Sequence, residues 1–163
     1  MKPEYTDIYL DYREGEECPW AYKYPRPSVT ADCLLFSKNE NVLYVLLIRR
    51  GGEPFKGCWA FPGGFLETGM EDVEQCARRE LLEETGLTAG ELQLVGVYSK
   101  PGRDPRCPVV TASYCGFVEM TEPHGGDDAA EARWIPVDRV GELAFDHSEM
   151  LKKALTIINK IIK

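Results

Sequence analysis

One segment, "GGFLETGMEDVEQCARRELLEETGL" at residues 63–87, constrains the fold of this chain more than any other. Val73, Ala77 and Leu81 are spaced four apart within it. This spacing places them on one face of a helix, and we predict a helix over residues 71–85. Because the face is apolar, it should pack against the rest of the domain.

The same helix crowds three carboxylates together. Glu80 lies three and four positions before Glu83 and Glu84, so the three side chains are neighbours on the helix surface. Exposed like-charge pairs of this kind cost a few tenths of a kcal/mol each, roughly, and a nearby cation reverses that cost. Two interpretations stay open: a solvated acidic face, and a metal site beside the turn "PGG" and Arg79.

Length and charge limit the classes of protein to which the chain can belong. At 163 residues it is long enough for one domain, which we place at residues 29–163 after an N-terminal arm at 1–28. The 19 basic and 27 acidic residues give a formal charge of −8, which argues against a long nucleic acid as partner. We find no leader sequence, no membrane span and no C-x-x-C pair, and we expect a cytoplasmic protein.

The order of apolar segments predicts an α/β or α+β sandwich in which a mixed β-sheet is flanked by helices. "SVTADCLLF" and "NVLYVLLIRR" should form a hairpin, and "LQLVGVYS", "VVTASYCGFVEM" and "RWIPV" should form further strands. The closing segment "DHSEMLKKALTIINKIIK" has the pattern of a helix. Asp146 and Glu149 would form a capping box at its start.

The segment at residues 63–87 resembles the signature of the Nudix hydrolases, written G-x5-E-x7-R-E-U-x-E-E-x-G-U with U a bulky apolar residue. The following positions fall in register: Glu71, Arg79, Glu80, Leu81, Glu83, Glu84, Gly86 and Leu87. The chain departs from the pattern once, because six residues instead of five separate Gly64 from Glu71. The flanking "KGCWAFPGGF" and "EARWIPV" also look like this family, so the resemblance spans residues 28–140.

The resemblance implies a hydrolase that uses Mg²⁺ or Mn²⁺ to cleave a nucleoside diphosphate linked to another group. It implies that Glu80, Glu83 and Glu84, with the carbonyl of Gly63, bind the metal. It also implies that Arg79 pairs with Glu71 and holds the loop against the helix. The extra loop residue leaves the position of Glu71 open.

The general base is not fixed by the resemblance. Glu80 is one candidate, and Glu131 is another, in the loop before Trp134 that also contains Asp127 and Asp128. Ordinary loop solvation is the alternative for these loop acids. We assign His124 and His147, the two histidines of the chain, to structure or solvent.

The segment "YSKPGRDPR" resembles a part of ADP-ribose pyrophosphatases, which often have a proline about where Pro101 stands. We therefore expect Arg103 to contact a phosphate or ribose and Asp104 to accept from ribose hydroxyls, unless the segment is only a tight turn. Arg50, at the end of its strand, would meet the pyrophosphate. Four aromatic residues are candidates for stacking on adenine: Trp20, Tyr22, Trp59 and Phe61.

ADP-ribose or another ADP-sugar is therefore the substrate that we expect, with AMP and a sugar phosphate as products. One alternative is a nucleoside triphosphate diphosphatase that removes damaged nucleotides such as 8-oxo-dGTP. Another is a Nudix-fold sensor that binds a nucleotide without cleaving it. About 25 residues follow "WIPVDRV", too few for a winged-helix domain of the kind that some such sensors contain. Relatives that cleave ADP-ribose often pair, so a homodimer is possible.

Overall fold

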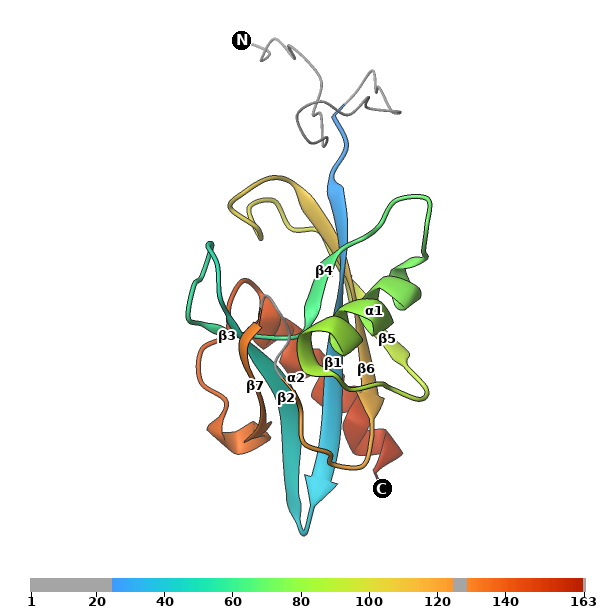
Figure 1. Cartoon of the computed structure of the whole chain (residues 1–163), viewed down its shortest axis with the longest axis vertical. Helices are drawn as coiled ribbons and strands as arrows, with labels where there is room; N and C mark the ends of the chain where they lie inside the picture. Colours follow the sequence, from blue (N-terminus) through green and yellow to red (C-terminus); the bar gives the residue numbers. More distant parts are fainter. Residues whose placement is uncertain (1–24, 125–128, 163) are drawn as a thin grey trace.

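A mixed β-sheet forms the centre of the computed structural model, which describes residues 25–124 and 129–162 (Figure 1). Its strands are β1 (Ser28–Asn39), β2 (Val42–Arg50), β3 (Trp59–Ala60), β4 (Gly63–Phe65), β5 (Gln93–Tyr98), β6 (Val109–Phe117) and β7 (Ala129–Pro136). The main path runs β3-β2-β1-β6-β5, while β4 pairs with β1 and β7 pairs with β2. β1 and β6 run parallel, and β1 and β2 form the predicted hairpin. Most of the arm expected at residues 1–28 lies outside the described residues.

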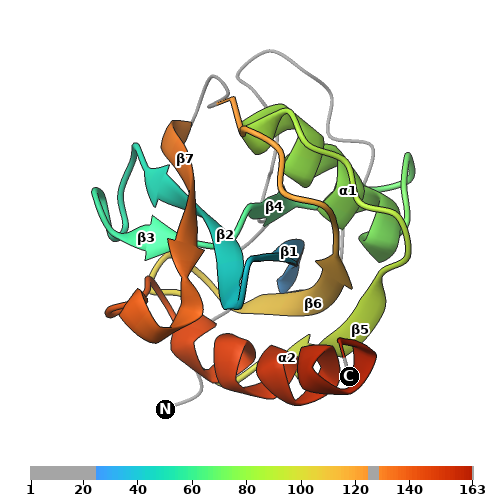
Figure 2. The ribbon, with the colours of Figure 1, turned by 90° about the horizontal axis from the view of Figure 1, so that it is seen from below.

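Two helices cover the two faces of this sheet (Figure 2). α1 (Val73–Thr85) lies on one face and α2 (His147–Ile161) on the other, with the short 3-10 helix η1 (Val137–Arg139) between β7 and α2. β1 is buried on both sides, so its side chains alternate between the two cores. Cys33 lies in the core beneath α1, whereas Leu34 lies in the core beneath α2. The predicted sandwich of a mixed sheet flanked by helices is therefore confirmed.

α1 begins and ends where its sequence supplies capping residues. Asp72 is the N-cap. Its side chain accepts hydrogen bonds from the backbone N–H groups of Glu74 and Gln75 at 3.0 and 2.9 Å. The side chain of Gln75 accepts in return from the backbone of Asp72, which completes a capping box. Gly86 ends the helix in the left-handed conformation with φ of 69°. The predicted start at residue 71 was therefore two residues early.

The capping box predicted for α2 is wrong. Asp146 occupies the N-cap position, but its side chain makes no capping hydrogen bond. Both of its carboxylate oxygens accept instead from Arg103, at 2.9 and 2.7 Å. The pairing joins residues 43 positions apart, so local sequence spacing could not reveal it.

The structure describes five of the six cysteines. Of the cysteines, Cys33, Cys76 and Cys115 are buried, whereas Cys58 is exposed and Cys107 is half-buried; all five are free thiols. Cys18 lies outside the described residues. Within residues 25–124 and 129–162, no helix has the length and apolar character of a transmembrane span.

Replacement of Asp72 by Ala tests the capping of α1. The change removes two hydrogen bonds to the first turn, and we expect the free energy of unfolding to fall by about 1 kcal/mol. Urea denaturation followed by circular dichroism measures this. Asp146→Asn is the comparison at the N-cap of α2. Because Asp146 makes no capping hydrogen bond, any fall in the free energy of unfolding there would come from the ion pair with Arg103.

Candidate active site

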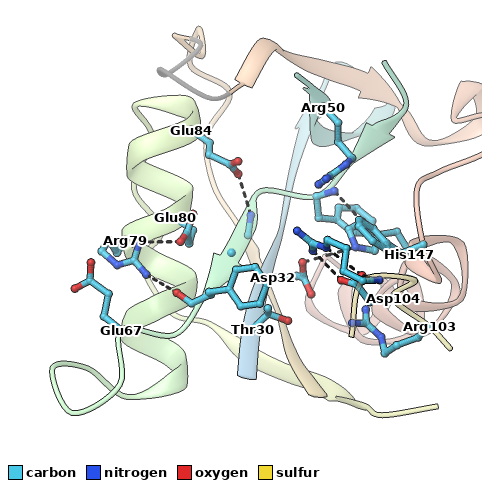
Figure 3. Close-up of a pocket in the computed structure, with 16 residues that line it drawn as sticks. Thr30, Asp32, Arg50, Glu67, Arg79, Glu80, Glu84, Arg103, Asp104 and His147 are labelled. Atoms are coloured by element: carbon cyan, nitrogen blue, oxygen red, sulfur yellow. Dashed lines mark hydrogen bonds and ion pairs between the residues drawn. The ribbon is translucent and has the colours of Figure 1, made fainter. Parts of the chain in front are cut away.

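A cavity of about 410 Å³ opens between α1 and the loops that precede β6 and α2 (Figure 3). Its charged lining divides into two sides. The acidic wall consists of Glu67, Glu80 and Glu84, and the basic wall consists of Arg50, Arg103 and Arg106. Asp32, from the middle of β1, lies between them, as Figure 3 shows. A cavity with separate negative and positive walls suits a ligand that combines a cation with phosphates.

Arg79 fixes the geometry of the acidic wall. Its Nε and Nη2 donate to the two carboxylate oxygens of Glu71 at 3.0 and 2.8 Å. Its Nη1 donates to Glu80 at 2.7 Å and to Glu83 at 3.0 Å, while Nη2 also reaches the carbonyl of Phe65 at 3.0 Å. These charge-assisted bonds raise the pKa of Arg79 above its ordinary value, the bond to Glu71 most of all. The expected pair of Arg79 and Glu71 is present, and it ties the loop after β4 to α1.

Glu84 is the most strongly perturbed carboxylate of the wall. Burial raises the pKa of Glu84 to about 8, and the charges of Glu80 and Asp32 add to this against the opposing hydrogen bond from the Gly63 backbone. That bond is 2.9 Å long. Burial likewise raises the pKa of Glu80, although Arg79 opposes the shift. Burial therefore disfavours the charged forms of Glu80 and Glu84. A cation bound beside them would stabilise these charged forms.

The donor set fits a hard divalent cation. Among the described residues, no three acidic, histidine or cysteine side chains are already arranged around one point. Glu80, Glu84 and Asp32 nevertheless line one cavity with oxygen donors only, the type that Mg²⁺ and Mn²⁺ prefer. A Cβ atom on Gly64 would collide with the carboxylate of Glu80, so glycine at this position lets the loop approach that group.

Three expected site residues do not line the cavity: Glu71, which is bound to Arg79, and also Glu83 and Glu131. Glu83 pairs with Arg79, but 57% of its side chain is exposed and it does not line the cavity. Glu131 sits on β7 opposite Arg49, forms an ion pair with Arg133, and does not line the cavity either. The other loop candidates for the base, Asp127 and Asp128, lie outside the described residues. The roles of Glu83 and Glu131 stay predictions.

The structure brings the three expected substrate-binding residues, Arg50, Arg103 and Asp104, to the cavity. Arg50 donates to the carbonyl of Pro54 at 2.8 Å. Arg103 is 5% exposed and bound to Asp146. Asp104 accepts from the side chain of Arg106 at 3.1 and 2.7 Å and from its backbone at 2.9 Å. The loop that contains Arg103 and Asp104 is therefore held by two ion pairs, one within the loop and one to the start of α2.

Sequence reasoning missed Asp32, and it assigned His147 to structure or solvent although His147 lines the cavity. His147 is buried, and its Nδ1 accepts from the backbone of Phe61 at 3.1 Å. Its Nε2 lies 3.7 Å from Asp32, whose other oxygen accepts from Thr111 at 2.6 Å. An acid inside the apolar strand "SVTADCLLF" was the available signal for Asp32.

The aromatic residues at the cavity include only one of those expected to stack on adenine. Phe61 lines the cavity, but it is only 2% exposed and stacks on His147. Trp59 packs against the core under α2. Trp20 and Tyr22 lie outside the described residues. Phe65 and Phe145 also line the cavity, and Phe65 is 44% exposed.

Comparison with known proteins agrees with this geometry. A model of the NUDIX domain matches residues 26–154. An "ADP-ribose pyrophosphatase" of Methanocaldococcus jannaschii is 43% identical over 129 residues, which cover 79% of this chain and 73% of that protein. The chain belongs to the Nudix family.

Two further relatives of this Nudix chain bind or respond to ADP ribose. The NUDIX domain of Shewanella oneidensis NrtR, solved in complex with ADP ribose, superimposes with a TM-score of 0.78 at 29% identity, over 83% of this chain and 90% of that one. An "ADPR responsive transcriptional repressor NtrR" of Acinetobacter baylyi is 34% identical over 83% of this chain. The match spans only 56% of the repressor's length.

Within the Nudix signature, the extra residue between Gly64 and Glu71 does not displace Glu71. The side chain of Glu71 is 9% exposed and makes both bonds to Arg79, and it also accepts from the backbone of Glu67 at 3.0 Å. The loop therefore accommodates the insertion before Glu71 is reached, and it includes Gly69 at φ of 82°. A left-handed conformation of this kind costs glycine little.

The bonds to Arg79 lower the pKa of Glu71 from 4.5 to about 2, and this gives a pH-dependent prediction. A depressed pKa stabilises the fold above the unfolded value, and the contribution is lost as pH falls through the folded value. We expect Glu71→Gln to lower the free energy of unfolding by about 1–2 kcal/mol at neutral pH. The difference from the wild type should shrink between pH 4.5 and 2, as measured by denaturation at several pH values. A difference independent of pH would contradict the role of the ion pair.

Proposed function

We propose that this protein is a metal-dependent Nudix pyrophosphohydrolase that cleaves ADP-ribose or a similar ADP-sugar into AMP and a sugar phosphate. The observation that supports it is the cavity itself, in which carboxylates of α1 face arginines of the basic wall. A diphosphate with a bound cation is complementary to both sides. Similarity to an ADP-ribose pyrophosphatase and to a NUDIX domain solved with ADP ribose supports the choice of substrate.

Glu80 and Glu84 are the principal metal ligands in this proposal, with Glu83 and the carbonyl of Gly63 as additional ones. When bound, Mg²⁺ or Mn²⁺ lowers the pKa of the attacking water and neutralises charge on the phosphoryl oxygens. Arg79 holds Glu80 in place, and Glu71 holds Arg79. The elevated pKa values of Glu80 and Glu84 mean that the cation also favours the charged form of both carboxylates.

The substrate-binding roles of Arg50, Arg103 and Asp104 stay predictions from the sequence, as do Glu80 and Glu131 as candidates for the general base. In this proposal Arg50 contacts the pyrophosphate of the substrate. Arg103 and Asp104 lie in the loop before β6, at the wall opposite the glutamates. A cytoplasmic location, a homodimer and the absence of a long nucleic acid among the partners stay predictions from the sequence.

Turnover across a panel of nucleotides tests the proposed reaction. The panel contains ADP-ribose, another ADP-sugar, NADH, a diadenosine polyphosphate and 8-oxo-dGTP, each with Mg²⁺ and with products separated by chromatography. We expect ADP-ribose to be cleaved fastest, to AMP and ribose 5-phosphate. Faster cleavage of triphosphates, with release of pyrophosphate, would favour a nucleoside triphosphate diphosphatase that removes damaged nucleotides.

A sensor that binds ADP-ribose without cleaving it is the second candidate, favoured by the likeness to NrtR and to the repressor from Acinetobacter baylyi. Calorimetry with ADP-ribose separates the two functions. A sensor would bind ADP-ribose and release no AMP in the presence of either Mg²⁺ or Mn²⁺. Release of AMP at a steady rate would exclude that function.

Substitutions on α1 test the assignment of the metal ligands. We expect Glu80→Gln and Glu84→Gln each to lower kcat by at least about a hundred-fold, because each removes a charged ligand. Glu83→Gln should cost less, since its side chain is exposed outside the cavity. Glu74→Gln is the matched control, because Glu74 lies on the same helix and pairs with Arg78. Equal losses in all four variants would contradict the assignment.

A further inference from the structure

Two arginines from distant parts of the chain converge on one aromatic ring at the cavity. The guanidinium carbon of Arg50 lies 4.9 Å from the centre of the Phe145 ring, and that of Arg106 lies 6.0 Å from the same centre. Arg106 also lies 5.2 Å from the centre of the Phe65 ring. All four residues line the cavity. The aromatic faces fix the guanidinium groups in place by cation–π contact.

Ion pairs among the described residues balance the positive charge at this position only in part. Arg106 forms a bidentate pair with Asp104, whereas Arg50 makes no ion pair with any carboxylate in the described part of the chain. Burial lowers the pKa of Arg50, and the nearby charge of Arg106 lowers it further. Two guanidinium groups and one carboxylate leave an excess of one positive charge facing the cavity. A bound anion would relieve this repulsion.

Arg106 retains hydrogen-bond donors for such an anion. Its Nε and Nη2 donate to Asp104, and its Nη1 has no partner among the residues described. Arg103 is bound in the same way, through Nε and Nη2 to Asp146, but its side chain is only 5% exposed, against 41% for that of Arg106. Arg103 therefore anchors the loop to the start of α2, while Arg106 lines the cavity with a more accessible guanidinium group.

We propose that Arg106 and Arg50 form a phosphate-binding site for the phosphate of the substrate that lies farther from Glu80 and Glu84. The proposal rests on the proposed function and assigns to Arg106 the phosphate contact that the sequence suggested for Arg103. Asp104 is then a positioning residue, since both of its oxygens hold the guanidinium of Arg106. The site explains why the cavity has a basic wall opposite its carboxylates.

Binding measured without metal tests this site separately from catalysis. Isothermal titration calorimetry in EDTA gives the dissociation constants of ADP-ribose and of inorganic pyrophosphate. Because Arg106→Ala alone would leave the buried Asp104 without its partner, we compare Asp104→Asn with Asp104→Asn/Arg106→Ala. Loss of a charge-assisted phosphate contact should weaken the binding of both probes by about ten-fold or more. Thermal unfolding verifies that both variants are folded.

Arg49→Ala is the matched control. Arg49 directly precedes Arg50 in β2 and is exposed. It does not line the cavity, and it donates a hydrogen bond to the carbonyl of Gly57. Arg49→Ala removes one positive charge, as the Arg106→Ala substitution does. We expect it to change either dissociation constant by less than about two-fold, because salt screens exposed charges at a distance.

The outcomes separate this proposal from the proposed function. Equal weakening by the Arg49 and Arg106 substitutions, or no binding of either probe to the wild type, would overturn the phosphate site. Cleavage of ADP-ribose with an unchanged KM in the Arg106 variant would overturn the site and leave the function standing. Arg106-dependent binding of pyrophosphate without cleavage of ADP-ribose would support the site and refute the function.

Discussion

The bonds of Arg79 determine the arrangement of everything else at the candidate site. A guanidinium has five N–H donors in a fixed plane, and in Arg79 these reach Glu71, Glu80, Glu83 and the carbonyl of Phe65. One side chain thus connects the loop after β4 to two turns of α1. Lysine could not replace it, because an ammonium group has three donors and no planar fork. The glutamates can stand close together because this cation lies among them.

The cavity is organised by a separation of charge. On one side, burial raises the pKa values of Glu80 and Glu84, so a cation would be stabilised there. On the other side, Arg50 and Arg106 repel each other around Phe145, so an anion would be stabilised. A diphosphate that binds a divalent metal satisfies both requirements at once. The protein's formal charge of −8 gives no hint of this local positive region, because net charge averages over the whole surface.

The sequence predicted what depends on local spacing. The helix of α1, its end at Gly86, the β1–β2 hairpin and the pair of Arg79 with Glu71 follow from periodicity or from the family signature. It did not predict contacts between distant segments. The capture of Asp146 by Arg103 and the convergence of Arg50 and Arg106 depend on how the sheet places its loops. Such contacts leave no periodic trace in one sequence.

The most direct test of the account is a titration of Mn²⁺ against the metal-free protein, followed by electron paramagnetic resonance of the free ion. The central claim is that the partly buried carboxylates of α1 bind a divalent cation. It predicts a saturable site in the wild type and in Glu74→Gln, and its loss in Glu84→Gln. Unchanged Mn²⁺ binding in Glu84→Gln would contradict the claim, since the carboxylate with the most elevated pKa of the acidic wall would then have no part in holding the metal.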